Sequence, residues 1–253
     1  RYLRNTNQKN QFTSGFIGFG NPVLAQTTAP LRGLKAIEFD GKNYTLSHKI
    51  RRLPSLPNTE KEILAIAGLL DLESNSVFLR NDATETNVKS IDLSKASFLS
   101  FATHGLSANQ FDLAKEPSLI FTPPDIPTAL DDGLLLASEI AQLRINADVV
   151  LLSACNTADG LTPGGESLSG LARAFFYAGA KSVVVSHWGV ISGTTKDLMI
   201  GMIKKMRNKR SLPMHRALQL SILDLIDNEK IKYSAHPAAW APFSLVGEGA
   251  TIN

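Results

Sequence analysis

Apolar residues follow two kinds of spacing along this chain. Residues 148–154 form a nearly continuous apolar run, a pattern typical of a strand buried on both faces of a parallel sheet. Residues 97–103 and 182–186 are further strand-like runs with apolar residues at their centres. Between the runs at 148–154 and 182–186, apolar residues return every three or four positions, as in a helix, and Gly179 suits the helix end. The strand–helix–strand order predicts a right-handed parallel crossover and an α/β fold. The helical positions are Leu168, Leu171, Ala172, Phe175 and Phe176.

Weaker patterns predict the remaining elements. Residues 57–60 open a helix with Asn58 or Thr59 as its N-cap, and Ile63, Ile66, Ala67 and Leu70 form its apolar stripe. The other expected elements are a buried strand and turn at 16–20, a short strand at 77–79, a capped helix start at 82–85, an edge strand at 119–121, a hairpin-type turn at 132–133, helices at 137–143, 194–207 and 213–227, and a last strand at 240–247.

Composition bounds the class of protein. The 253 residues can bury a substantial core, as one large domain or two smaller lobes. No apolar run reaches the length of a membrane span, so we expect no membrane association. A single cysteine excludes an internal disulfide framework and a cysteine-rich zinc site. Because the chain begins at Arg1, we expect a processed product or an excised piece, with residues 1–33 as an irregular lead-in rather than a signal peptide.

The charged and glycine-rich segments point to no ligand. The net charge is +3, and the basic cluster between Lys204 and Arg210 has no interleaved aromatics, so nucleic-acid binding is not expected. No His, Cys or carboxylate pair has metal-ligand spacing. The loop 160–165 lacks the lysine of a phosphate-binding loop, and we interpret it as a mobile loop over a site.

Three predicted strand ends carry residues that can do chemistry. They are His104-Gly105, Cys155 and His187-Trp188. Sites in open parallel sheets lie beyond the carboxyl ends of strands, and an imidazole beside a thiol favours the nucleophilic thiolate. The N–H groups of Gly105 and Cys155 are candidate donors to an oxyanion. Two alternatives stay open: Cys155 as a buried inert cysteine, and His187 as the base in place of His104.

The motifs around these residues resemble the CHAT family, caspase-like domains related to separases and often joined to tetratricopeptide repeats. His104 and Cys155 are 51 residues apart, close to the spacing of about 50 in caspases. Residues 18–22 also resemble the first strand and turn of that family. The matching motifs are Ala102-Thr103-His104-Gly105, Leu152-Ser153-Ala154-Cys155-Asn156-Thr157, the stretch from Gly164 to Phe175, and His236-Pro237 with Trp240-Ala241-Pro242-Phe243.

The resemblance implies a caspase-like three-layer α/β sandwich, with a mostly parallel central sheet flanked by helices. The family domain would span residues 34–253, with a His-bearing part to about 145 and a Cys-bearing part after it. It also implies a cysteine endopeptidase in which His104 is the general base, Cys155 the nucleophile and Gly105 an oxyanion donor. The predicted substrate-binding residues are Ser153, Ser186, His187, Trp188 and Ser192.

The resemblance further implies no cofactor, a protein or peptide substrate, and a repeat region N-terminal to Arg1 or a regulatory partner protein. A bacterial, cytoplasmic protein is expected on the same basis. The chain departs from the family at Ser192, where many members have an acidic residue; in separases this residue receives a basic P1 side chain. A buried arginine would lack its counter-charge there, so we predict a neutral or small P1 residue.

Two other functions remain possible from the sequence. A catalytically silent caspase-like module would keep the fold as a scaffold or sensor. A different thiol acyl-transfer enzyme, such as an amidase, would use the same dyad in a closed pocket instead of an open groove.

Overall fold

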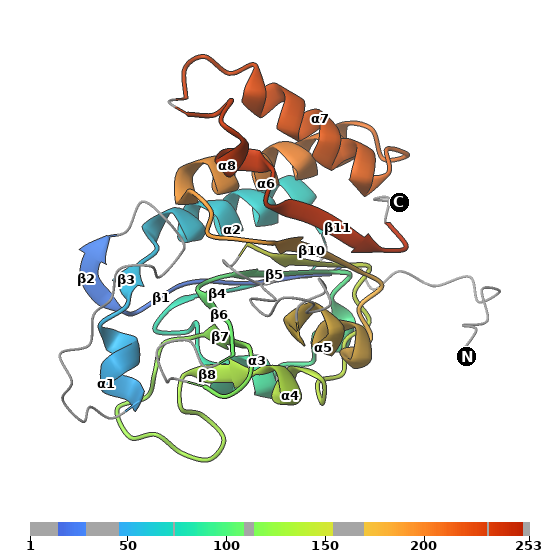
Figure 1. Ribbon diagram of the computed structural model, residues 1–253. Helices are drawn as coiled ribbons and strands as arrows, with labels where there is room; N and C mark the ends of the chain where they lie inside the picture. Colours follow the sequence, from blue (N-terminus) through green and yellow to red (C-terminus); the bar gives the residue numbers. More distant parts are fainter. Residues whose placement is uncertain are drawn as a thin grey trace.

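The computed structural model describes residues 15–28, 46–72, 74–108, 114–153, 170–231 and 233–249. Its centre is a six-stranded sheet of order β11-β10-β9-β5-β1-β4, parallel except for β11, which pairs antiparallel with β10 (Figure 1). The mostly parallel sheet predicted from the apolar runs is therefore confirmed. The strands are β1 (Gly15–Pro22), β4 (Ser74–Arg80), β5 (Phe98–Ala102), β9 (Val149–Leu152), β10 (Ser182–Ser186) and β11 (Phe243–Gly247).

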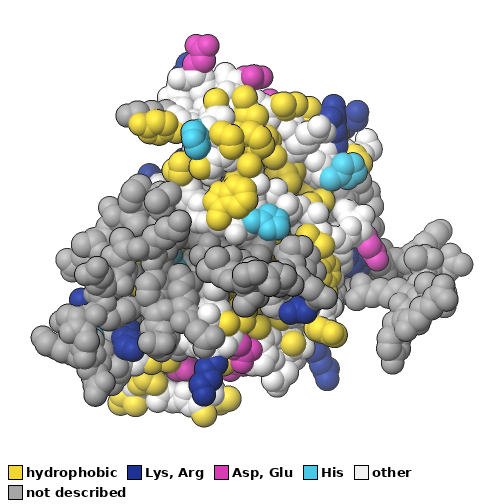
Figure 2. All heavy atoms as spheres, in the orientation of Figure 1, with side chains coloured by type: hydrophobic (Ala, Val, Ile, Leu, Met, Phe, Trp, Pro, Cys, Tyr) yellow, Lys and Arg dark blue, Asp and Glu magenta, His cyan; other side chains and the backbone are white. Residues whose placement is uncertain are grey.

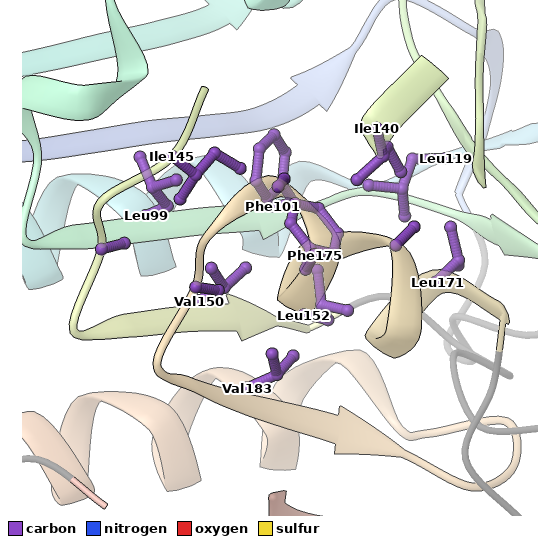
Figure 3. Packing of buried hydrophobic residues seen from close by; sticks show 14 of the residues in the cluster. Leu99, Phe101, Leu119, Ile140, Ile145, Val150, Leu152, Leu171, Phe175 and Val183 are labelled. Carbon is purple, nitrogen blue, oxygen red and sulfur yellow. The ribbon is translucent and has the colours of Figure 1, made fainter. Parts of the chain in front are cut away.

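Helices cover both faces of this sheet and complete the three layers (Figure 1). On one face lie α2 (Pro57–Leu70), α6 (Ser192–Asn208) and α7 (Met214–Ile226), which share an apolar core with alternate residues of the strands. On the other lie α3 (Glu85–Ser90), α4 (Ala137–Ile140) and α5 (Gly170–Ala178). In this second core Phe101 packs against Phe175 with ring centroids 5.2 Å apart (Figure 3).

Smaller elements complete the fold, most of them near the carboxyl edge of the large sheet. A three-stranded antiparallel sheet has β7 at its centre, so the strand expected at 119–121 is not an edge strand. Leu119 is buried in the large core that contains Phe101, and Ile120 is buried in a smaller core with Ile50 and Leu53. Successive residues of β7 therefore face two different cores. The remaining elements are α1 (Leu46–Arg51), β2 (Ala25–Thr28), β3 (Pro54–Ser55), the 3-10 turn η1 (Leu93–Lys95), β6 (Gly105–Leu106), β7 (Ser118–Ile120), β8 (Leu134–Leu136) and α8 (Pro237–Trp240).

Three local predictions were wrong. The N-cap of α2 is Leu56 with Pro57 at the first helical position, so Thr59 lies inside the first turn, where its hydroxyl donates to the Leu56 carbonyl oxygen and accepts from the Asn21 N–H. The turn at residues 132–133 does not close a tight hairpin, since residues 121–133 separate β7 from β8. The last strand begins at Phe243, because residues 237–240 form the helix α8, capped by the His236 side chain.

Glycines in β1 allow α2 to lie close to the sheet. A Cβ on Gly18 would come within 2.8 Å of the Ile63 side chain, and one on Gly20 would come within 3.2 Å of the Thr59 carbonyl oxygen. This close packing brings the first two turns of α2 to the carboxyl ends of the parallel strands.

Among the helices of the described segments, none is both long and apolar enough to span a membrane.

Candidate active site

Strands β5 and β9 direct the chain toward the same edge of the sheet. They are parallel neighbours, and their register pairs Phe98 with Val149 through Phe101 with Leu152, an offset of 51 residues. His104 and Cys155 are separated by the same number of residues in the sequence. His104 follows the end of β5. Cys155 and the loop 160–165 lie outside the described residues.

His104 is held in a defined orientation beneath this edge. The residue is only 1% exposed, and its Nε2 lies 2.8 Å from the carbonyl oxygen of Pro54 in β3. Because a carbonyl only accepts hydrogen bonds, Nε2 must carry the proton, and in the neutral ring Nδ1 is then the basic nitrogen. The structure thus fixes the tautomer that a general base at Nδ1 would need.

Gly105 begins β6, directly after His104. The N–H of Ile120 donates to the His104 carbonyl oxygen at 2.9 Å, and Gly105 pairs with Leu119 in the antiparallel ladder. Hydrogen-bonded and non-hydrogen-bonded pairs alternate in such ladders, so the Gly105 N–H points away from β7. This direction is compatible with the oxyanion-donor role predicted for Gly105.

A third strand end lies on the other side of β9. The ring of His187, after β10, has its Nε2 2.9 Å from the Ser244 hydroxyl oxygen of β11. Trp188 next to it is 44% exposed. Hydrophobic and histidine side chains gather on the face of the molecule that carries α8 and the end of β10 (Figure 2). An exposed indole at this place can form the wall of a groove.

The three serines predicted to bind substrate are all buried: Ser153 after β9, Ser186 at the end of β10, and Ser192 at the start of α6. The Ser153 hydroxyl donates to a carboxyl oxygen of Glu62 on α2 at 2.5 Å. Because β5, β9 and β10 are parallel, Ser153 and His104 lie at the same edge as Ser186, which ends β10, and His187 and Trp188, which follow it. The contacts of these residues with a substrate stay predictions.

Two groups at this edge were missed by sequence reasoning. One is the Pro54 carbonyl, which orients His104; a backbone group carries no mark in the sequence. The other is Glu62, which reads as one more charge on the polar side of an amphipathic helix. The available clue is its spacing: Glu62 comes four residues before Ile66, which places it on the same face of the helix as the apolar stripe.

No group of three or more His, Cys, Asp or Glu side chains within the described segments could hold a metal ion.

Solved structures of cysteine proteinases share this arrangement of elements. The Arg-specific cysteine proteinase gingipain R aligns with a TM-score of 0.58 and 11% identity, over 95% of this chain and 48% of that chain. The complex of the Porphyromonas gingivalis RgpB pro- and mature domains aligns with a TM-score of 0.55 and 10% identity, with the same coverage. At such identities the likeness establishes the fold alone, which is that of the caspase-like cysteine proteinases.

The chain belongs to the CHAT domain family, whose model matches residues 1–248. Tetratricopeptide repeat protein 28 of Mus musculus is 27% identical over 227 residues, and the Homo sapiens protein of that name is 26% identical over 234. Each alignment covers 78% of this chain but only 9% of the relative. The predicted family and its link to repeat proteins are confirmed, whereas the bacterial, cytoplasmic origin stays a prediction.

Proposed function

We propose that this domain is a cysteine endopeptidase in which His104 is the general base and Cys155 the nucleophile. The observation that carries the proposal is the orientation of His104. This residue follows β5, the strand paired with β9, and its Nε2 is hydrogen-bonded to the Pro54 carbonyl oxygen. The equal offset of 51 residues in the strand register and in the His–Cys spacing supports the same pairing. The family and the fold of the cysteine proteinases agree with it.

The chemistry follows the usual course for a thiol nucleophile. The Cys155 proton passes to His104 Nδ1, and the sulfur attacks the peptide carbonyl carbon to form a C–S bond. The C–N bond then breaks, and the leaving amine takes the proton from His104. A water molecule, deprotonated by His104, cleaves the thioester and releases the acid. The Gly105 N–H stabilises the oxyanion in both halves of the reaction.

A protein or peptide is the proposed substrate, and Trp188 forms one wall of its groove. We further propose that a repeat region or regulatory partner controls the site. This is supported by the repeat-protein relatives and by the pro-domain complex of the gingipain neighbour.

Three single substitutions test the dyad on an unfolded protein substrate such as reduced casein. Cys155→Ala should abolish cleavage, and His104→Ala should slow it by about 10²–10⁴-fold, the usual contribution of a general base. His187→Ala is the comparison variant: as a predicted substrate-binding residue it should raise KM, and it should lower kcat far less than His104→Ala does. The opposite ranking of the two histidine variants would make His187 the base. If the wild-type chain neither cleaves casein nor reacts with a peptidyl electrophile, the silent scaffold is the correct function.

The proposed P1 preference is tested with the active enzyme on a peptide library. Ser192 is buried and uncharged at the start of α6, so cleavage should follow neutral or small residues. Mass spectrometry of the products measures this, and dominant cleavage after Arg or Lys would contradict it.

A further inference from the structure

A buried carboxyl group lies against the carboxyl edge of the sheet and has no part in the dyad chemistry. Glu62 on α2 is 0% exposed, and its Oε1 accepts the hydrogen bond from the buried Ser153 hydroxyl. Glutamate is almost never fully buried unless it is paired, and removing a carboxyl group from water is unfavourable without hydrogen bonds.

The position of Glu62 matches a role in fixing the strand ends. One turn earlier on α2, the Thr59 hydroxyl accepts from the Asn21 backbone N–H at 2.8 Å, and Glu60 accepts from the Asn21 side chain at 2.7 Å. These two contacts fasten the end of β1 to the helix, and the Glu62 contact fastens the end of β9. Strand β5, which leads to His104, lies between β1 and β9. Helix α2 therefore contacts the ends of both strands that flank β5.

We propose that Glu62 is a positioning residue of the active site. Through Ser153 it holds the carboxyl end of β9 beside β5, the strand that leads to His104. The proposed nucleophile Cys155 follows Ser153 by two residues in the sequence. The inference rests on the proposed His104–Cys155 dyad. An acceptor oxygen at residue 62 is the feature that matters, so glutamine should replace glutamate and alanine should not.

Alkylation of Cys155 tests this without any turnover. The chain has a single cysteine, so the rate of iodoacetamide addition, followed by intact mass from pH 5 to 10, reports on that thiol alone. A thiol without an aligned imidazole has an ordinary pKa of about 8.5 and is only a few per cent thiolate at pH 7. Glu62→Ala and Ser153→Ala should therefore each slow alkylation at pH 7 roughly tenfold, and the double variant should be no slower than either single variant.

Two further variants serve as controls. Glu62→Gln should alkylate within about threefold of the wild-type rate, because glutamine keeps an acceptor oxygen for Ser153. If the negative charge of Glu62 were required instead, this variant would be as slow as Glu62→Ala. Glu60→Gln alters a carboxyl group on the same helix that bonds to β1 instead of β9, and it should behave as wild type. Thermal unfolding of each variant shows whether it is folded; if Glu62→Ala is not, Ser153→Ala decides alone.

The outcomes separate this inference from the dyad on which it rests. If His104→Ala shifts the pH profile of alkylation but neither Ser153→Ala nor Glu62→Ala does, the dyad stands and the positioning role is wrong. If His104→Ala also leaves the profile unchanged, the dyad itself is wrong. A Glu62→Gln enzyme that alkylates normally but selects different P1 residues would place Glu62 in a substrate pocket and overturn the proposal.

Discussion

Single glycines decide how closely the site-bearing helix approaches the sheet. The Cβ of an alanine at Gly18 would lie 2.7 Å from the Phe16 ring and 2.8 Å from the Ile63 side chain, closer than carbon atoms can pack. Gly68, on the exposed side of α2, has no atom within 4 Å of the position that an alanine methyl group would take. The same substitution can therefore be compared at two glycines: at Gly18 the added methyl group would clash, and at Gly68 it would not.

We predict opposite effects for alanine at these two positions. Gly18→Ala should lower the free energy of unfolding by about 1–3 kcal/mol, as overpacking does in other cores. Gly68→Ala should raise it by about 0.5–1 kcal/mol, because alanine has the higher helix propensity. Urea unfolding followed by circular dichroism measures both. Equal effects of the two substitutions would contradict the close packing of α2 on β1.

At the scale of the element, a buried glutamate joins α3 to the segment before β8. Glu85 accepts hydrogen bonds from the backbone N–H groups of Asp132 and Gly133, and the Lys89 ammonium lies 2.5 Å from its other oxygen. Burial raises the pKa of Glu85 to about 7, against the opposing effect of Lys89 and the backbone donors. The other charged groups facing this cluster are Asp131, Asp132 and Glu139.

This pKa predicts a pH-dependent stability. The folded state binds the Glu85 proton more tightly than the unfolded chain, whose ordinary pKa is 4.5. The stabilisation by that proton is complete below about pH 4.5 and is lost as the pH rises to about 7. Relative to Glu85→Gln, the wild-type free energy of unfolding should therefore fall by roughly 2 kcal/mol across this range. Urea titrations at pH 4.5, 6 and 7.5 measure the difference, and parallel curves for the two proteins would exclude it.

At the scale of the whole molecule, the His-bearing and Cys-bearing parts share one sheet. Strand β9, from the second part, lies between β5 of the first part and β10 of the second. The Phe101 ring in β5 contacts Phe175 in α5, at 5.2 Å between centroids. Neither part can bury its strands without the other, so the described elements should unfold together.

The two tryptophans provide a test of this cooperativity, because Trp188 and Trp240 both lie in the second part. Phe101→Ala, in the first part, should destabilise the fold by about 3–5 kcal/mol. The transition seen by tryptophan fluorescence should then shift as far as the one seen by far-ultraviolet circular dichroism. As a control from the opposite core, Met202→Ala should move both signals equally. Separate transitions would indicate two independent lobes.

The apolar patterns determined the class of fold and the strand ends that carry chemistry. Residues 149–152 and 183–185 are apolar at every position, which is typical of strands in a sheet covered on both faces. The strand-like runs located His104 and His187 just after β5 and β10, and they predict Cys155 beyond the end of β9. Local sequence suffices for these features because they depend on neighbours within a few residues.

Tertiary structure alone decided the contacts that organise the site. The Thr59 hydroxyl accepts from the Asn21 N–H at the end of β1, the Pro54 carbonyl selects the His104 tautomer, and Glu62 accepts from Ser153 across 91 residues of chain. Each contact joins segments whose proximity depends on the order and register of the strands. Propensity and spacing carry no information about such distant pairs. The sequence therefore shows the candidate residues, whereas the packing of α2 on the sheet decides which groups contact the strand ends.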